Sequence, residues 1–286
     1  MRRIGRAILA LLAVGFAYIA YLYLTLPDVR GLRTSNPETT AFMELRAREA
    51  RSQGEPARRV YKWASYARIS QHLKRAVLVA EDGAFWTHEG VDYDQLKESI
   101  EANIERMEFA RGGSTITQQL AKNLYLSPSK NPIRKLRELL IARQLETELS
   151  KPRILELYLN VIEWGDGIYG AEAAARTYFH KSAADLSAQE SALLAGAIVN
   201  PRVLDPGHPT PRLRRRQQMV MRRMGAVTPP PVVAGPVASP ETPLEAPPGP
   251  VPEMPETGGV PPVLPGEALP EPMGPGGKPP GGGRQP

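Results

Sequence analysis

The 286-residue sequence contains no cysteine. This absence excludes disulfide frameworks, thiol nucleophiles and cysteine-based metal sites. Strand signals are also scarce, because alternating β-branched residues are nearly absent while apolar residues recur at spacings of three and four. His88 has no second histidine four residues away, so a zinc site is not indicated there. The folded part of the chain is therefore expected to be mostly helical.

The C-terminal residues 227–286 carry 20 of the 30 prolines, six glutamates and only two basic residues. Such a segment cannot bury enough apolar surface to offset the entropy of ordering it, so it is predicted to be a disordered tail. Its net charge of −4 leaves +10 for residues 1–226, given +6 for the whole chain. A basic body suits anionic head groups or phosphorylated ligands, although a solubilising surface would have the same composition.

The N-terminal region has one long apolar run. Ala7 to Leu26 contains no charged residue and, at about 1.5 Å per residue in a helix, could span the hydrocarbon core of about 30 Å. Arg2, Arg3 and Arg6 precede it, so we expect this end to stay cytoplasmic and the rest to be exported. A cleaved signal peptide is the alternative, but Ala17–Ala20 lies inside the run and is a poor cleavage site.

Helix signals divide the remaining body. Ser70 is predicted to cap a helix that ends near Glu81, and Ser114 to cap another after two glycines. Ser187 begins a Ser-x-x-Glu capping box ahead of a helix that stops before Pro201. The next long helix is predicted from leucines at helical spacing, which should form its buried face: Leu136, Leu139, Leu140, Leu145 and Leu149.

Three polar stretches are candidates for chemistry. Glu81 closes an apolar helix beside aromatic residues, where partial desolvation would raise the pKa of a carboxylate toward that of a general base. In the stretch 113–123, Thr115, Gln118 and Lys122 share one helix face that could hold sugar hydroxyls and a phosphate. Arg134 and Glu138 form an i, i+4 pair. Taken singly, the Glu81 stretch is more typical of a solvated helix end, and the Arg134–Glu138 pair of a routine surface salt bridge. The polar face of 113–123 could equally be a solvated surface.

Together these stretches resemble family 51 of the glycosyltransferases, the peptidoglycan polymerases. The first motif is matched at Glu81, Asp82, Phe85, His88 and Gly90. The second is matched at Gly112, Ser114, Thr115, Thr117, Gln118, Gln119, Leu120, Lys122 and Asn123, and the third at Arg134, Lys135 and Glu138. The fourth runs from Lys151 to Asn160 and the fifth from Gly165 to Gly170. Five ordered motifs make the resemblance specific.

The resemblance implies a lysozyme-like helical head with a small membrane-facing jaw lobe between Asp92 and Gly112. It implies that Glu81 is the catalytic base and Glu138 the second catalytic acid residue. It assigns substrate binding to residues of the first three motifs, namely Asp82, Phe85, His88, Ser114, Thr115, Thr117, Gln118, Gln119, Lys122, Asn123, Arg134 and Lys135. The predicted divisions are a basic stub (1–6), a transmembrane anchor (7–26), a juxtamembrane linker (27–59), the glycosyltransferase domain (60–226) and the tail (227–286).

The implied reaction joins a lipid-pyrophosphate-linked glycan to the 4-hydroxyl of lipid II with inversion, giving β-1,4 bonds. A divalent cation, Mg²⁺ or Mn²⁺, could assist at the pyrophosphate, with no identified ligands and no organic cofactor. Expected partners are the lipid substrates, the cytoplasmic (inner) membrane and cell-wall synthesis or division proteins, not nucleic acid. The catalytic domain is expected on the periplasmic face. A lytic, lysozyme-like enzyme and a non-catalytic membrane scaffold are the alternatives.

A transpeptidase module is not expected. The one Ser-x-x-Lys match, at residues 127–130, lies in a proline-containing loop inside the polymerase domain, and no Lys-Thr-Gly occurs. The sequence is therefore interpreted as a monofunctional polymerase.

Overall fold

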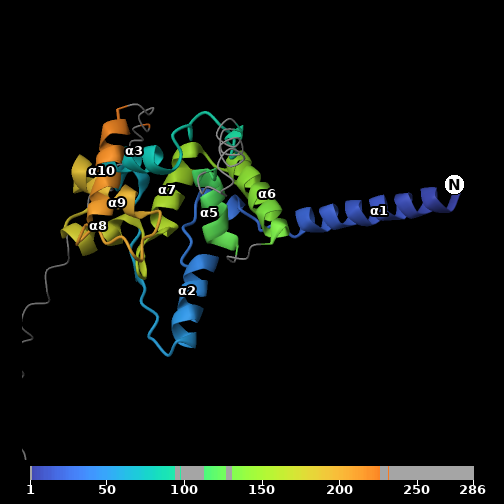
Figure 1. Ribbon diagram of the computed structural model, residues 1–286, viewed down its shortest axis with the longest axis horizontal. Coiled ribbons are helices and arrows are strands. Elements are labelled where there is room, and N and C mark those ends of the chain that lie inside the picture. The colour runs from blue at the N-terminus through green and yellow to red at the C-terminus, as the bar shows by residue number, and fades with distance from the viewer. Residues whose placement is uncertain (1, 94–96, 98–112, 127–130, 226–230, 232–286) are drawn as a thin grey trace, which may run out of the picture. The chain divides into compact units, whose positions relative to one another are not determined.

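The computed structural model describes residues 2–93, 97, 113–126, 131–225 and 231 (Figure 1). The predicted jaw and the predicted tail lie outside the described residues, apart from Asp92, Tyr93, Lys97 and Pro231. Both therefore stay predictions.

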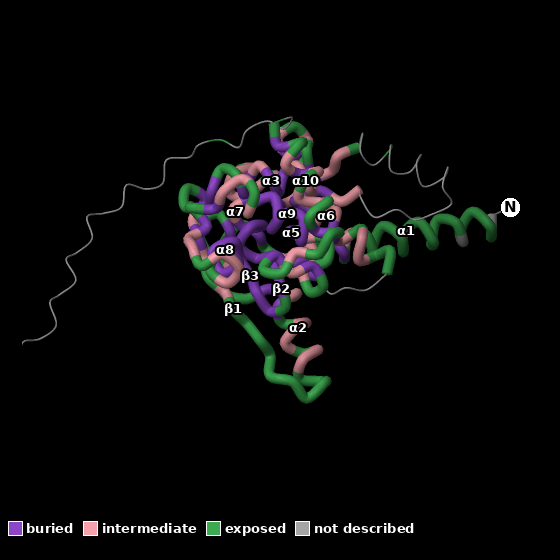
Figure 2. Tube along the Cα trace, turned by 60° about the vertical axis from the view of Figure 1, so that its left-hand side comes forward, coloured by how far each residue is buried: buried purple, intermediate pink, exposed green. Residues whose placement is uncertain are grey.

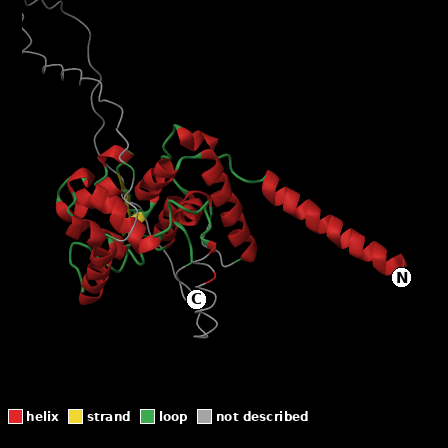
Figure 3. Ribbon diagram, turned by 90° about the horizontal axis from the view of Figure 1, so that it is seen from above, coloured by secondary structure: helices red, strands yellow, loops and turns green. Residues whose placement is uncertain are grey.

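Helices dominate the described residues (Figure 3), which confirms the predicted helical class. The first, α1 (Arg2–Leu24), exposes most of its apolar side chains. By length and composition it could cross a membrane, and no other helix among the described residues meets that test. Its location in a membrane stays a prediction.

The end of α1 contacts the folded body through Thr25. Arg137 donates from Nη1 to Thr25 Oγ1 (3.1 Å) and from Nη2 to the Thr25 carbonyl (2.8 Å). Leu22 is buried beside this junction. The guanidinium thus donates a hydrogen bond to a carbonyl that has no partner within the helix, as is usual at a helix end.

Eight further helices form the described body. They are α2 (Ala41–Ser52), α3 (Gln71–Glu81), α5 (Ile116–Tyr125), α6 (Pro132–Glu148), α7 (Lys151–Val161), α8 (Ala171–Phe179), α9 (Ala188–Ala197) and α10 (Pro211–Arg223). Three 3₁₀ turns lie between them, at Arg30–Arg33, Tyr66–Arg68 and Ala183–Asp185. Proline occupies the first turn of α6, α7 and α10, where its missing N–H leaves no bond unmade.

A three-stranded sheet accompanies the helices, in the order β1 (Val60–Tyr61), β3 (Ile168–Tyr169), β2 (Glu163–Gly165). The β1–β3 pair is parallel, with Val60 opposite Ile168, and the β2–β3 pair is antiparallel. These strands tie the segment before α3 to the segment between α7 and α8.

A large apolar core fills most of the body. Side chains from α3 to α10 form one large buried cluster, beside a small one of Leu193, Ala197, Leu204 and Leu213. Figure 2 shows buried residues, in purple, concentrated around α3, α5 and α9. In α3 the buried positions include Leu73, Ala76 and Val77, and α5 buries Ile116 and Leu120. This packing holds the C-terminal end of α3 against α5.

The predicted helix starts are partly correct. Ser70 caps α3 by accepting a bond from His72 N, and the capping box at Ser187 is present. The predicted cap at Ser114 is wrong, because Thr115 is the N-cap of α5 and accepts a bond from Gln118 N. Thr115 also donates to the Gly90 carbonyl (2.7 Å), a long-range bond that fixes the helix start one residue later.

The predicted stripe of α6 holds only in its second half. Leu145 is buried as expected, and so is Leu149 just after the helix end. Leu136, in contrast, is 41% exposed, and Glu138 is only 3% exposed. The first half of α6 thus turns a carboxylate inward in place of a leucine.

Candidate active site

Glu81 is the last residue of α3, a helix that packs one face in the core. Its Oε2 accepts a hydrogen bond from Gln119 Nε2 on α5 (2.9 Å). Burial raises the pKa of Glu81 above its ordinary value, and the Gln119 bond and the charges of Arg216 and Lys122 oppose that rise. The direction agrees with the expectation from sequence.

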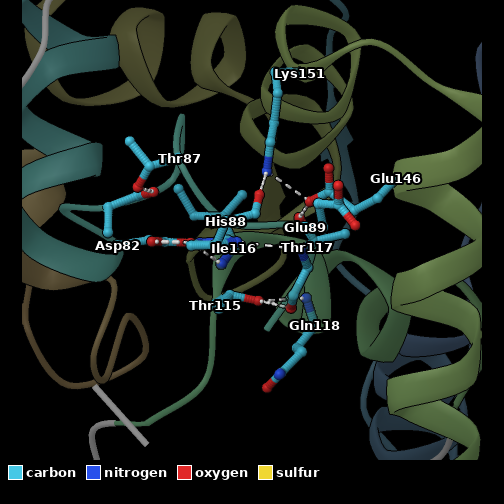
Figure 4. Close-up of polar contacts among 12 residues, drawn as sticks. Asp82, Thr87, His88, Glu89, Thr115, Ile116, Thr117, Gln118, Glu146 and Lys151 are labelled. Carbon is cyan, nitrogen blue, oxygen red and sulfur yellow. Dashed lines mark hydrogen bonds and ion pairs between the residues drawn. The ribbon is translucent and has the colours of Figure 1, made fainter. Parts of the chain in front are cut away.

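The segment after Glu81 is held by Asp82, which is 2% exposed. Its Oδ2 accepts from the Ile116 backbone N–H at the start of α5 (2.9 Å). His88 Nε2 lies 2.9 Å from Oδ1, and His88 Nδ1 accepts from Gly90 N (3.1 Å). Since Nδ1 must offer its lone pair to that N–H, the ring proton lies on Nε2 and is donated to Asp82. Asp82 and His88 therefore fold the segment against α5 (Figure 4).

A second set of contacts holds the same segment from α6 and α7 (Figure 4). Lys151 Nζ donates to the His88 carbonyl (2.6 Å) and to Glu146 Oε1 (2.8 Å), and it lies 4.5 Å from the centre of the Phe85 ring. Glu146 Oε1 also accepts from Thr117 Oγ1 (2.5 Å). We call Lys151, Glu146 and Thr117 the clamp. It joins three helices to the segment that follows Glu81.

Gly90 shows how closely the segment approaches α6. Its φ is +87°, which is strained for any residue with a side chain, and a Cβ there would lie 3.1 Å from Glu146 Cγ. The glycine of the first motif is therefore required by backbone conformation and by the position of the clamp.

Lys151→Met is expected to destabilise the protein by about 1–3 kcal/mol, because it leaves the Glu146 carboxylate, whose side chain is 8% exposed, without its cation. The measurement is urea unfolding of detergent-solubilised protein, followed by circular dichroism. Arg143→Met is the matched control, since Arg143 pairs with Glu89 of the same segment but both side chains are exposed. Lys151→Met with Glu146→Gln should recover part of the loss. Equal effects of Lys151→Met and Arg143→Met would contradict a specific role for the clamp.

A second polar cluster surrounds Glu138 on α6. Arg134 Nη1 donates to Glu138 Oε2 (2.8 Å), and Lys135 Nζ donates to Oε1 (2.5 Å). Lys135 also donates to Ser114 Oγ (3.3 Å) and Gln118 Oε1 (3.2 Å). Because Glu138 is buried, the Arg134–Glu138 pair is not the routine surface salt bridge that its spacing alone allows.

Lys122 belongs to α5 and is half-buried. Its charge interacts both with Glu81 and with the cluster around Glu138. Desolvation lowers the pKa of Lys122, and the nearby cations Arg134 and Lys135 act in the same direction, against Glu138 and Glu81. Among the described residues no hydrogen-bond or salt-bridge partner meets its ammonium. A desolvated cation beside other cations is electrostatically suited to bind an anion.

The structure thus brings the predicted residues together in two groups along α5. The base group contains Glu81 and Gln119, with Asp82, Phe85, His88, Thr115 and Thr117 in the contacts that position them. The cation group contains Lys122, Arg134, Lys135, Glu138, Ser114 and Gln118. Asn123 is buried and donates to the Gln119 carbonyl, so its amide supports the helix.

The sequence prediction of the site missed four residues. Lys151 and Tyr158 stand in the fourth motif, which offered a signal, whereas Glu146 belongs to no motif. Arg216 stands among six arginines of α10, so nothing in the sequence distinguishes the one whose charge acts on Glu81.

The predicted divalent cation finds no ligand set in the described part of the chain, where no three His, Asp or Glu side chains gather as a metal site would require. Both oxygens of Glu138 are already bonded to cations. The cation stays an untested prediction.

Comparison with known proteins decides the family. A transglycosylase family model matches residues 48–225. The chain belongs to the transglycosylase family. It is 45% identical over 219 residues to a biosynthetic peptidoglycan transglycosylase of Nitrosomonas eutropha, covering 77% of this chain and 88% of the relative. A protein of the same name from Chromobacterium violaceum is 44% identical over 227 residues, covering 79% of this chain and 99% of the relative.

A third relative with that name, from Dechloromonas aromatica, is 47% identical over 191 residues, covering 67% of this chain and 83% of the relative. The predicted family and the prediction of a glycosyltransferase enzyme are confirmed. The predicted domain boundaries stay predictions, with the family match at 48–225 beside a predicted domain of 60–226.

Proposed function

We propose that this transglycosylase polymerises lipid-linked disaccharide units, transferring a lipid-pyrophosphate-linked glycan to the 4-hydroxyl of lipid II. The product is a β-1,4 bond, formed with inversion of the α-linked donor. The observation that carries the proposal is the arrangement along α5. Gln119 bonds the proposed base, and Lys122 of the cation group follows three residues later, about 4.5 Å along the helix axis. One helix thus serves the acceptor and the leaving group.

Glu81 is the proposed general base. A sugar hydroxyl is a weak nucleophile, so a carboxylate must take its proton as the oxygen attacks the donor's anomeric carbon. Burial strengthens Glu81 for this task by raising its pKa. Within the described part of the chain, Gln119 is the one hydrogen-bond donor to this carboxylate, which leaves acceptor positions for a substrate hydroxyl.

The cation group is proposed to hold the pyrophosphate. That leaving group departs as a stable anion and needs positive charge where negative charge develops, not a proton. A glycosidase instead requires a general acid to protonate a sugar oxygen. Glu138 does not suit that role, because Arg134 and Lys135 bond both of its oxygens. We assign Glu138 to orienting these two cations, and Ser114 and Gln118 to the sugar-phosphate end of the donor.

The test offers purified protein two substrates in parallel, fluorescent lipid II in detergent and purified cell-wall sacculi. The proposal expects glycan polymer from lipid II, with β-1,4 linkages by mass spectrometry after muramidase digestion, and no soluble fragments from sacculi. Release of muropeptides from sacculi without polymer would instead identify a lytic enzyme. Inactivity on both substrates, for protein with a cooperative unfolding transition, would support the scaffold alternative.

The anchor is proposed to confine the enzyme to the membrane that carries both substrates. Removing residues 2–20 should reduce turnover in liposomes at least about ten-fold through lost effective concentration, and much less in detergent micelles. This deletion keeps Leu22 and Thr25, which contact the body. Polymer formation measured in both media tests the prediction.

A chain with residues 2–20 replaced by an unrelated apolar helix serves as the control and should recover liposome activity. Equal loss in liposomes and micelles would show that the helix itself contributes to the substrate site.

A further inference from the structure

Tyr158 is a buried titratable residue that the proposed reaction does not use. It lies within α7 and is fully buried among core side chains. Its hydroxyl lies 3.0 Å from Gln119 Oε1, and the same amide donates from Nε2 to Glu81 Oε2 (2.9 Å). A continuous chain of hydrogen bonds therefore runs from the core to the proposed base.

The orientation of the Gln119 amide follows from its partners. An ionised carboxylate only accepts hydrogen bonds, so the NH₂ group must face Glu81. Nε2 also approaches the Ser114 carbonyl (3.4 Å), which is another acceptor. Oε1 then faces Tyr158, whose hydroxyl must donate its single proton. If the amide were rotated by 180°, its oxygen would face the Glu81 carboxylate and the Ser114 carbonyl, which are both acceptors.

We propose that Tyr158 is a positioning residue for catalysis, whose hydroxyl holds the Gln119 amide with its NH₂ group toward Glu81. Tyr158 is too deeply buried to touch substrate, so it acts through Gln119. The inference rests on the proposed function, since it takes Glu81 as the base.

The hydroxyl is suited to constant donation. Complete burial, with the charges of Glu81 and Asp82, raises the pKa of Tyr158 well above its ordinary value, so the proton is retained throughout the working range. Without that proton the amide could rotate and present Oε1 to Glu81. An oxygen there favours the protonated carboxyl, which would raise the pKa of Glu81 further.

Other charged groups also act on Glu81 and must stay unchanged in the test. Lys122 from α5 and Arg216 from α10 lower the pKa of Glu81, and Asp82 at the end of α3 raises it. Substitution at Tyr158 leaves all three in place and alters only the amide.

The experiment measures kcat/KM against pH for lipid II polymerisation by full-length Tyr158→Phe. The acid limb should move to higher pH by about one unit. At a pH above the acid limbs of both proteins, the kcat of Tyr158→Phe should be lower than that of the wild type by about ten-fold or less, because the carboxylate is less well oriented. Tyr169→Phe is the matched control, since that hydroxyl is also buried but has no hydrogen-bond partner within the described residues. Its acid limb should stay in place.

Gln119→Leu tests whether Tyr158 acts through the amide. This variant should move the acid limb in the same direction, and the double variant with Tyr158→Phe should move it no further than Gln119→Leu alone. A limb unmoved in Tyr158→Phe, or additive shifts in the double variant, would overturn the inference. If Tyr158→Phe does not fold, a limb unmoved in Gln119→Leu would overturn it as well.

The two proposals fail differently. A wild-type protein that forms no polymer contradicts the proposed function. If the wild-type protein forms polymer and the acid limb of Tyr158→Phe lies at the same pH as that of the wild type, only the role of Tyr158 is contradicted.

Discussion

Glu81→Gln is expected to reduce polymerisation by about 10²–10⁴-fold while leaving the fold and lipid II binding nearly unchanged. The amide keeps the size of the side chain and can still accept the Gln119 bond through its oxygen. It cannot take a proton from the attacking hydroxyl. The measurements are single-turnover polymerisation with fluorescent lipid II, equilibrium binding of the same substrate, and thermal unfolding.

Glu89→Gln is the matched control, because Glu89 follows in the same segment but its side chain is 78% exposed. It should polymerise at the wild-type rate. Near-normal turnover of Glu81→Gln would place the base elsewhere, and Glu138→Gln would then be the next variant to measure.

The pH profile of the wild-type protein gives a second measure of the same base. Because burial raises the pKa of Glu81, the carboxylate becomes protonated at a higher pH than an ordinary glutamate. Activity should therefore fall, as the pH is lowered, at a point above the ordinary glutamate value of about 4.3. Loss of activity only below that value would contradict the desolvated environment of Glu81.

Local signals in the sequence predict much of the helical framework. Ser70 and Ser187 begin helices because a side-chain oxygen meets an orphan backbone N–H within the same turn, and no distant residue is needed. Ser114 and Thr115 could both serve that purpose. The choice of Thr115 depends on its bond to the Gly90 carbonyl, 25 residues away, which no local pattern contains.

The site depends more heavily on such distant contacts. Helical periodicity placed Leu136 inside, and the spacing of Arg134 and Glu138 taken alone allowed a routine surface salt bridge. The fold instead exposes Leu136 and buries Glu138 against Arg134 and Lys135. Similarly, Lys151 reaches the His88 carbonyl across 63 residues. Sequence motifs identify which residues belong near the site, but only the packing of α5 against α6 and α7 separates the side chains that face substrate from those that position them.

Lys122→Ala is expected to reduce polymerisation by about 10²–10³-fold, through removal of a charge placed where the leaving group becomes negative. Both kcat and the apparent affinity for the donor should fall, measured with a short lipid-linked glycan as the limiting donor. Lys181→Ala is the control, since Lys181 pairs with Glu190 away from the site and should leave turnover unchanged.

Stability should respond in the opposite sense to activity. Desolvation lowers the pKa of Lys122, so at neutral pH its charged form is disfavoured by folding. Replacing Lys122 by alanine removes that cost, and urea unfolding should show unchanged or greater stability. A buried structural lysine would behave differently, because its loss would lower stability and activity together. Loss of activity without loss of stability is the pattern of a desolvated cation that serves an anionic substrate and not the fold. Wild-type donor saturation would instead place the pyrophosphate elsewhere.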